Sequence, residues 1–340
     1  MKVLLVHSGN AVEGETSKYT FVREQGEALQ QLGCEVEYYA VVGKGMKGYW
    51  QNVEPLRKKI LEFHPDVVHA HYGLCGMVAV LAARKEVPVV ITCHNGETLT
   101  KYGNIITSLA LRHAGYTICV AQHIYDKLYL KPRRYCIQPC GIDLKDLPLV
   151  DKQKAMKEMG LPDGKVNILF GGSFANARKN APLAKAALKW LDDERISGLK
   201  EFNLIEMRGF NRHQVAMLLN GCDMLLLPTK SEGSPQVLKE AMACNCPVVA
   251  TDVADIAFLL KGVTNSYVTT FDPKDVADKI QRVISCGERT NGRKRIKELK
   301  LDNPQVAETI LDIYKSIVQQ YGKDRSCCFL FAAVSSYAGE

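Results

Sequence analysis

The stretch from residue 223 to residue 252 reads DMLLLPTKSEGSPQVLKEAMACNCPVVATD and limits the possible folds more than any other part of the chain. Its two short apolar runs, residues 224–227 and 248–250, are typical of fully buried parallel strands. The segment between them, residues 235–244, has the composition of a short helix. Two buried parallel strands joined by a helix form a βαβ unit, so we expect any chemistry to lie in the turn that follows the first strand.

The predicted start of this helix is a candidate anion site. Ser234 has the side chain of a helix N-cap, and Pro235 suits the first helical position. The backbone N–H groups of Gln236, Val237 and Leu238 then have no partner within the helix and point out of the sheet's carboxyl edge. Such a helix end attracts anions, and phosphate above all.

Two carboxylates flank this helix start. Glu232 lies in the turn, and Glu240 lies one helical turn beyond Gln236 with its Cβ tilted back toward the N-terminus. Carboxylates repel phosphate unless they face another part of the same ligand, and a sugar nucleotide has a polyol at each end, for which each charge-assisted hydrogen bond contributes about 1.5–3 kcal/mol. The alternative is that Glu240 only complements the helix dipole and Glu232 is a solvated loop residue.

The string EGSPQVLKEAMACNCPVVATD closely resembles the E-x7-E signature of the family 4 (group 1) retaining nucleotide-sugar glycosyltransferases. The resemblance implies that Glu240 binds the nucleotide ribose, that Glu232 holds the donor hexose, and that the turn from Gly233 to Pro235 belongs to the donor site. Asn245 stands where the family usually has glycine, and asparagine tolerates the left-handed conformation that this helix end needs.

The resemblance covers the chain to about residue 320 and implies the GT-B architecture: an α/β fold of two Rossmann-like, doubly wound parallel-sheet domains facing across a cleft. Strands and helices alternate in the N-terminal half, as in such a sheet. The string IQPCGIDL resembles the family's passage between domains. We therefore expect an acceptor-side domain over residues 1–143, a nucleotide-sugar domain over 144–303, and a helix over 304–322 crossing back to the first domain.

Residues 323–340 end in SCCFLFAAVSSYAGE and match no pattern that we recognise. A partner contact, a membrane contact and disorder all remain open for this tail.

The loop after the first strand, SGNAVEGET, lacks the G-x-G-x-x-G fingerprint of dinucleotide-binding proteins. Gly14 still allows the backbone to approach a phosphate or sugar, and the resemblance implies that this loop faces the donor phosphates, with Glu13-Gly14 replacing the usual Gly-Gly pair. Farther on, residues 42–50 read VGKGMKGYW, which predicts a flexible surface loop that is basic enough to meet an anionic acceptor.

Three histidines follow strand ends in the N-terminal half. His69 and His71 lie at the end of the third predicted strand, residues 66–70, and His94 lies just past the fourth, residues 89–92. All three are therefore expected at the carboxyl edge of the sheet. Histidines at strand ends are more often hydrogen-bonded fixtures than zinc ligands, and we predict no metal. The resemblance assigns contact with the donor sugar to a His-Gly turn, which makes His94 the candidate although Asn95 intervenes before the glycine.

The loop GGSFANARKNAPL, expected before a helix over residues 180–191, carries Arg178 and Lys179. These cations are either solvated or placed to neutralise a diphosphate. In the family this loop has an arginine and, six residues later, a lysine that clamp the pyrophosphate; Lys179 matches the lysine, and Ser173 stands at the arginine position. Whether Arg178 takes over is open. The resemblance also implies that the turn at Gly209 borders the nucleotide base.

Composition is that of an ordinary soluble protein: 340 residues, 46% hydrophobic and 24% charged, long enough for two cores. A net charge of +7 suits phosphorylated substrates or an anionic membrane but not nucleic acid. Twelve cysteines without C-x-x-C or zinc spacing predict reduced thiols in a cytoplasmic protein, with peripheral association at the inner face of the plasma membrane left open. The first apolar run is too short for a signal peptide, and no run is long enough to span a membrane.

These observations predict a retaining glycosyltransferase that moves a hexose or N-acetylhexosamine from a nucleotide sugar to a hydroxyl of a glycan or lipid-linked acceptor, in glycan or polysaccharide biosynthesis. Glu232, His94 and Lys179 are the candidate catalytic residues. No cofactor or D-x-D metal site is expected, and UDP is the default nucleotide because it is frequent in the family. The alternatives are a sugar-nucleotide epimerase of similar fold and a non-catalytic sugar-nucleotide-binding subunit.

Overall fold

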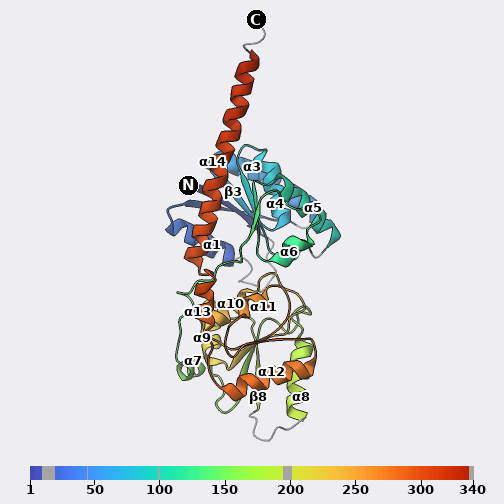
Figure 1. The fold of residues 1–340 in the computed structure, drawn as a ribbon, viewed down its shortest axis with the longest axis vertical. Coiled ribbons are helices and arrows are strands. Elements are labelled where there is room, and N and C mark those ends of the chain that lie inside the picture. Colours follow the sequence, from blue (N-terminus) through green and yellow to red (C-terminus); the bar gives the residue numbers. More distant parts are fainter. Residues whose placement is uncertain (10–19, 44, 99, 194–200, 337–340) are drawn as a thin grey trace. The chain divides into compact units, whose positions relative to one another are not determined.

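A computed structural model describes residues 1–9, 20–43, 45–98, 100–193 and 201–336 (Figure 1). The chain forms two compact units. Unit 1 comprises Met1–Pro139 and Pro304–Glu340, and unit 2 comprises Cys140–Asn303. The first boundary therefore follows Pro139, whereas the sequence pattern places it after residue 143.

Within the described residues, unit 1 contains a six-stranded sheet in the order β2-β1-β3-β4-β5-β6, and every neighbouring pair is parallel. Buried runs such as Val3–Val6 explain why these segments are central strands, since a strand covered on both faces is apolar along its length. The strands are β1 Lys2–Ser8, β2 Glu35–Val41, β3 Val67–His71, β4 Val89–Cys93, β5 Tyr116–Cys119 and β6 Tyr135–Ile137.

Helices cover both faces of this sheet. Val3 and Leu5 of β1 pack with α1 and with the terminal helix α14, whose Tyr314 is fully buried. Helix α4 packs between α3 and α5 (Figure 1). The helices of unit 1 are α1 Thr20–Gln31, α2 Gly45–Trp50, α3 Val53–Phe63, α4 Gly73–Ala83, the 3-10 turn η1 Gly96–Thr98, α5 Lys101–His113, α6 Gln122–Lys127 and α14 Asn303–Ser336.

Two segments of unit 1 differ from the sequence prediction. Residues 42–50, expected as a flexible loop, contain helix α2, because the glycines serve close packing: a Cβ on Gly48 would lie 2.5 Å from the Gly43 carbonyl carbon. The buried Asn52 amide donates to the carbonyls of Val42 and Gly48 and fixes this turn. Helix α14, expected to end at residue 322, continues to Ser336.

Unit 2 contains a five-stranded parallel sheet in the order β11-β10-β9-β7-β8 among the residues that the structure describes. Residues 223–252 form β9, a helix and β10, so the predicted βαβ unit is confirmed. The strands are β7 Val166–Phe170, β8 Phe202–Glu206, β9 Met224–Leu227, β10 Val248–Thr251 and β11 Tyr267–Thr269.

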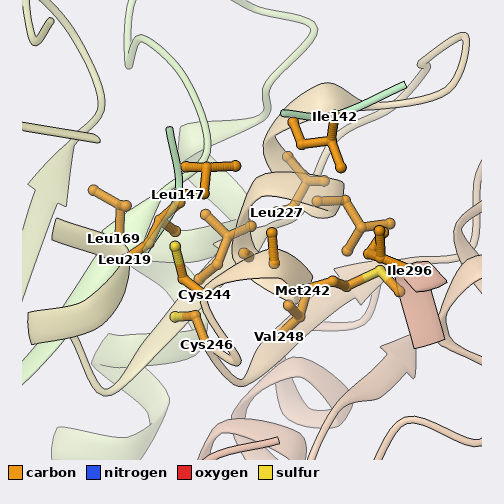
Figure 2. Packing of buried hydrophobic residues seen from close by; sticks show 14 of the residues in the cluster. Ile142, Leu147, Leu169, Leu219, Leu227, Met242, Cys244, Cys246, Val248 and Ile296 are labelled. Carbon is orange, nitrogen blue, oxygen red and sulfur yellow. The ribbon is translucent and has the colours of Figure 1, made fainter. Parts of the chain in front are cut away.

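Alternate side chains of these strands enter different cores. Ile168, Phe170 and Leu226 pack against α8 and α12 on one face. Leu169 and Leu227 pack on the other face with α9, α10 and α13, where Met242 of α10 meets Ile296 of α13 (Figure 2). The helices of unit 2 are α7 Lys152–Met159, α8 Ala181–Asp193, α9 Arg212–Gly221, α10 Gln236–Ala243, α11 Ile256–Leu260, α12 Pro273–Cys286 and α13 Gly292–Glu298.

Two doubly wound parallel sheets, each covered by helices on both faces, confirm the predicted fold class. A search of the described helices finds none with the length and hydropathy of a membrane span.

Candidate functional site

The helix that carries the E-x7-E spacing, α10, begins one residue later than predicted. Pro235 is its N-cap residue, with extended φ and ψ of −68° and 118°, and no side chain caps this end. The prediction that Ser234 caps the helix is therefore wrong: its buried hydroxyl bonds none of the first-turn amides and faces the Asp255 carboxylate instead. Pro235 already fixes the chain in the extended conformation of an N-cap, which leaves Ser234 one position too early to bond the first-turn amides.

Gln236, Val237 and Leu238 are the first three residues of α10. The first N–H that forms a helical hydrogen bond belongs to Lys239, which donates to the Pro235 carbonyl at 3.5 Å. In the described part of the chain no acceptor is bonded to these three amides. The site predicted for an anion therefore has its N–H groups available, and the positive end of the helix dipole adds to their attraction.

Glu232, the first glutamate of the signature, is buried beside this helix start. Its Oε1 accepts a hydrogen bond from the Lys179 ammonium at 2.7 Å and another from the Thr229 hydroxyl at 3.0 Å. A charge this well covered needs a partner of opposite sign, and Lys179 supplies it. Glu232 is therefore not the solvated loop residue of the alternative interpretation.

Lys179 reaches Glu232 because two loops at the carboxyl edge of the unit 2 sheet are joined. The Arg178 carbonyl, in the loop after β7, accepts bonds from the Lys230 N–H and the Thr229 hydroxyl in the loop after β9. Gly172 lies under the lysine stem, where a Cβ would approach the Lys179 side-chain carbons to 2.8–3.0 Å. Glycine at this position thus leaves the room that the lysine needs.

Arg178, the other cation of this loop, takes no part in the ion pair between Lys179 and Glu232. Arg178 is exposed, and no hydrogen bond or ion pair joins its guanidinium to the described residues. Ser173, at the family's arginine position, donates to Glu206 at 2.6 Å; this bond, followed by one from the Phe174 N–H, lowers the pKa of Glu206. Ser173 and Glu206 therefore fix the loop, while Arg178 remains the free cation beside Lys179.

Glu240, the second glutamate, pairs with the guanidinium of Arg212. Both side chains are mostly covered, with 12% and 27% of their surfaces exposed. Arg212 begins α9, whose start is fixed by a capping box in which Asn211 and Gln214 bond each other's backbone N–H groups. Sequence reasoning missed Arg212, although Asn211-x-x-Gln214 is the spacing of such a box and could have revealed the helix.

Gly209 lies in the exposed turn between β8 and α9, three residues before Arg212. Its φ of +79° is a conformation that favours glycine, and a Cβ there would meet no atom within 4 Å. The structure therefore explains the residue type at this turn, and its contact with a base stays a prediction.

In unit 1 the three histidines lie together at the end of the sheet, as expected. The His71 Nδ1 and His94 Nε2 atoms are 3.1 Å apart, and the His69, His71 and His94 rings form a stack with centroid separations of 4.6 and 5.4 Å. Phe21 and Tyr72 pack against the His94 ring. Gly14, the other candidate of this unit, lies outside the described residues.

The buried histidines are neutral at physiological pH. Burial lowers the pKa of His69 to about 3 and that of His71 well below its usual value, with the neighbouring histidines adding to the effect. His69 forms hydrogen bonds with the Tyr314 hydroxyl of α14 and the Thr92 hydroxyl of β4. It is therefore a hydrogen-bonded structural residue, as the sequence predicts. Within the described residues, no three His, Cys, Asp or Glu side chains are arranged to hold a metal ion.

Two family models match the chain, one on each unit. The model described as Glycosyltransferase Family 4 matches residues 38–146, and the one described as Glycosyl transferases group 1 matches residues 165–286. The second match contains the whole α10 site with Lys179, Arg212, Glu232 and Glu240.

Named relatives are distant. An uncharacterised glycosyltransferase of Methanocaldococcus jannaschii is 26% identical over 71% of this chain and 72% of its own length. A D-inositol 3-phosphate glycosyltransferase of Geodermatophilus obscurus is 27% identical over 66% of this chain and 60% of its own length.

Solved structures match almost the whole chain. Sucrose-phosphate synthase of Thermosynechococcus elongatus has a TM-score of 0.77 at 17% identity, covering 94% of this chain and 99% of that one. HepE of Anabaena, solved in complex with UDP, has a TM-score of 0.70 at 15% identity, covering 93% and 100%. Two family models, one per unit, and two parallel-sheet units with the fold of these enzymes lead to one conclusion: the chain belongs to the family 4, group 1 glycosyltransferases and has the GT-B fold.

Proposed function

We propose that this protein transfers a hexose or N-acetylhexosamine from a nucleotide sugar to a hydroxyl group of a glycan or lipid-linked acceptor, with retention of the anomeric configuration and without a metal ion. The observation that carries the proposal is the pairing of both signature glutamates with cations beside the open amides of α10. Each glutamate is held in place, and each keeps acceptor capacity for a polyol.

The roles follow from charge. The diphosphate binds the Gln236, Val237 and Leu238 amides, while Lys179 and Arg178 neutralise the charge that grows on it as the sugar leaves. Glu240 accepts hydrogen bonds from the ribose hydroxyls and Glu232 accepts them from the hexose. His94 is assigned to the donor sugar by the family resemblance alone.

The proposed transfer needs no side-chain base. The bond between the sugar's anomeric carbon and the diphosphate oxygen breaks, the acceptor oxygen bonds to that carbon on the same face, and the acceptor's proton passes to the departing diphosphate oxygen. Preorganised cations and amides supply the stabilisation, an effect typically worth about 10²–10³ in rate for each donor removed.

UDP is the first nucleotide to test. The Anabaena HepE structures contain UDP and UDP-glucose, and that protein shares the fold of this chain. A cytoplasmic location, where sugar nucleotides are made, fits the proposal and the reduced state of the described cysteines.

The test is to incubate the full chain with UDP-, GDP- and ADP-sugars, in EDTA, with and without hydroxyl acceptors, and to follow nucleoside diphosphate release and product anomers by NMR. Acceptor-dependent release with an unchanged anomer is expected. An isomerised sugar nucleotide without acceptor would instead identify an epimerase, and tight donor binding without transfer or hydrolysis would identify a binding subunit.

A further inference from the structure

Helix α5 of unit 1 presents a stripe of large apolar side chains to the solvent (Figure 1). Tyr102, Ile105 and Leu109 are all exposed, Tyr102 by 79%, and their spacing of three and four residues places them on one face of the helix. A surface helix normally turns such a stripe toward the core and its polar residues toward the solvent. The exposed stripe of α5 therefore needs an explanation other than folding.

The buried face of α5 carries polar residues that have a structural role. Asn104 and Ser108 are buried there, and the Asn104 side-chain oxygen accepts hydrogen bonds from the Ser108 hydroxyl at 3.0 Å and from the Tyr129 N–H at 3.1 Å. The Asn104 side-chain nitrogen donates to the Lys127 carbonyl at 2.7 Å. These bonds hold the segment that follows α6 beside the first turns of α5.

The segment after α6 extends the exposed apolar area. Tyr129 and Leu130 are both exposed. The Lys131 ammonium fixes this segment, because it donates to the carbonyls of Tyr125 and Asp126 at 2.6 and 2.8 Å and lies over the Tyr125 ring. Contiguous exposed apolar side chains mark interaction sites more often than single ones do. We call the exposed side chains of this area the α5 surface: Tyr102, Ile105, Leu109, Tyr129 and Leu130.

Positive charge borders the α5 surface. The other exposed residues of α5 are Lys101, Arg112 and His113, and the helix contains no acidic residue. Between residues 101 and 135 the only acid is Asp126. The same stretch has six lysines and arginines, all exposed: Lys101, Arg112, Lys127, Lys131, Arg133 and Arg134. A partner that covers this area therefore has to be apolar and to carry negative charge.

A lipid bilayer that contains anionic lipids meets both requirements. Helices that lie in the membrane interface have an apolar stripe with lysine and arginine at its margins, and tyrosine is enriched at the level of the lipid headgroups. A polysaccharide could stack on the tyrosines but would leave Ile105 and Leu109 without apolar partners. A second copy of the chain, packed face to face, would bring the cations of both copies together.

We propose that unit 1 docks on an anionic lipid bilayer through the α5 surface. The apolar side chains enter the headgroup region, and Lys101 and Arg112 pair with lipid phosphates. The surface lies on the bilayer and does not cross it. The proposal goes beyond the proposed function and does not depend on it, because binding to a bilayer requires no sugar nucleotide.

The test is cosedimentation of the full chain with two kinds of vesicle, one of phosphatidylcholine alone and one of phosphatidylcholine and phosphatidylglycerol in equal parts. The wild type is expected to bind the mixed vesicles, and to bind them less in high salt, because salt screens the attraction to anionic lipids. Lys101→Gln/Arg112→Gln and Ile105→Gln/Leu109→Gln should each weaken this binding by about tenfold or more.

Two matched controls make the same kinds of change in unit 2. Lys154→Gln/Lys157→Gln removes two exposed lysines of α7, and Leu149→Gln/Phe271→Gln removes two exposed apolar side chains. Both controls should bind the mixed vesicles as the wild type does. Glutamine is a good helix former, so the α5 variants should keep the melting temperature of the wild type. The cation variant changes only exposed charges, so its result stands even if the apolar variant unfolds.

Three results would overturn the proposal. A wild-type chain that binds neither kind of vesicle would show that the surface has another partner. Wild-type binding in both α5 variants would place the membrane contact elsewhere in the chain. A wild-type dimer in sedimentation velocity without vesicles, dissociated by Ile105→Gln/Leu109→Gln, would assign the α5 surface to a second copy of the chain.

Discussion

The ammonium group of Lys179 lies 2.7 Å from the carboxylate of Glu232, and these side chains are only 15% and 9% exposed. The two residues lie in the turns after β7 and β9, which are neighbouring strands of the unit 2 sheet. In the proposed reaction the same ammonium group faces the sugar-binding glutamate and the leaving diphosphate, so it links the recognition of the sugar with the stabilisation of the leaving group.

The first prediction concerns this pair. Lys179→Met leaves Glu232 buried without its cation and is expected to cost up to about 3 kcal/mol of unfolding free energy and about 10²-fold in kcat/KM. The double variant Lys179→Met/Glu232→Gln should regain most of the stability, because no buried charge remains unpaired, and should stay inactive. Urea unfolding and donor turnover measure the two effects, with the exposed Lys230→Met as the control; full activity in Lys179→Met would refute the role.

The second prediction tests Arg212, whose guanidinium pairs with Glu240. Arg212→Leu removes the partner that orients this carboxylate, so nucleotide affinity should fall about tenfold, the loss also expected for Glu240→Ala. Because both changes disturb one contact, the double variant should be no weaker than the worse single variant. Titration with UDP measures the coupling, and Arg282→Leu, which changes an exposed arginine of α12, serves as the control. Additive losses would mean that the residues act separately.

The third prediction concerns Arg178. Its exposed guanidinium forms no hydrogen bond or ion pair with the described residues, so Arg178→Ala should change the unfolding free energy by less than about 0.5 kcal/mol. If Arg178 replaces the family arginine at the diphosphate, the same variant should raise KM for the donor severalfold or more. Steady-state kinetics measure KM for the donor. An unchanged KM would mean that Lys179, and not Arg178, is the residue of this loop that binds the diphosphate.

The fourth prediction follows from the buried histidines of unit 1. The folded pKa of His69 is about 3, below the value of about 6.5 expected in the unfolded chain. Between these values the unfolded state binds more protons, so unit 1 should lose stability as the pH falls from about 6.5 toward 3, with up to about 1.4 kcal/mol per pH unit from each such histidine. Hydrogen exchange of β3, corrected for its intrinsic pH dependence, measures this slope.

The slope should be shallower in His69→Asn, which removes the titrating ring, and unchanged in His64→Asn, because His64 is exposed and asparagine accepts its left-handed conformation. An identical slope in wild type and His69→Asn would show that other groups cause the acid sensitivity.

Much of the fold could be predicted from the sequence because each buried parallel strand corresponds to a short apolar run. The runs at residues 224–227 and 248–250, predicted as strands, form β9 Met224–Leu227 and β10 Val248–Thr251. Helix α2 could not be predicted in this way, because its glycines suggest a flexible loop. Only the structure shows that Gly48 packs closely against Gly43. The start of α10 was misplaced by one residue because Ser234 and Pro235 both suit a helix start, and local sequence does not choose between them.

For the site, the sequence supplied the residues of one contiguous motif and missed the partners that come from other elements. The E-x7-E spacing and the lysine at position 179 follow local patterns. Arg212 is the first residue of a helix that follows another strand, and only the fold of unit 2 brings it to Glu240 of α10. A local sequence pattern does not predict contacts between residues that lie far apart in the chain.

Titration of the full chain with UDP and a UDP-sugar, in wild type, Glu240→Ala and Glu232→Ala, tests the central claim most directly. The account predicts that Glu240→Ala weakens both ligands by about tenfold or more, whereas Glu232→Ala weakens only the UDP-sugar. Wild-type affinities for both ligands in both variants would contradict the assignment of the α10 site.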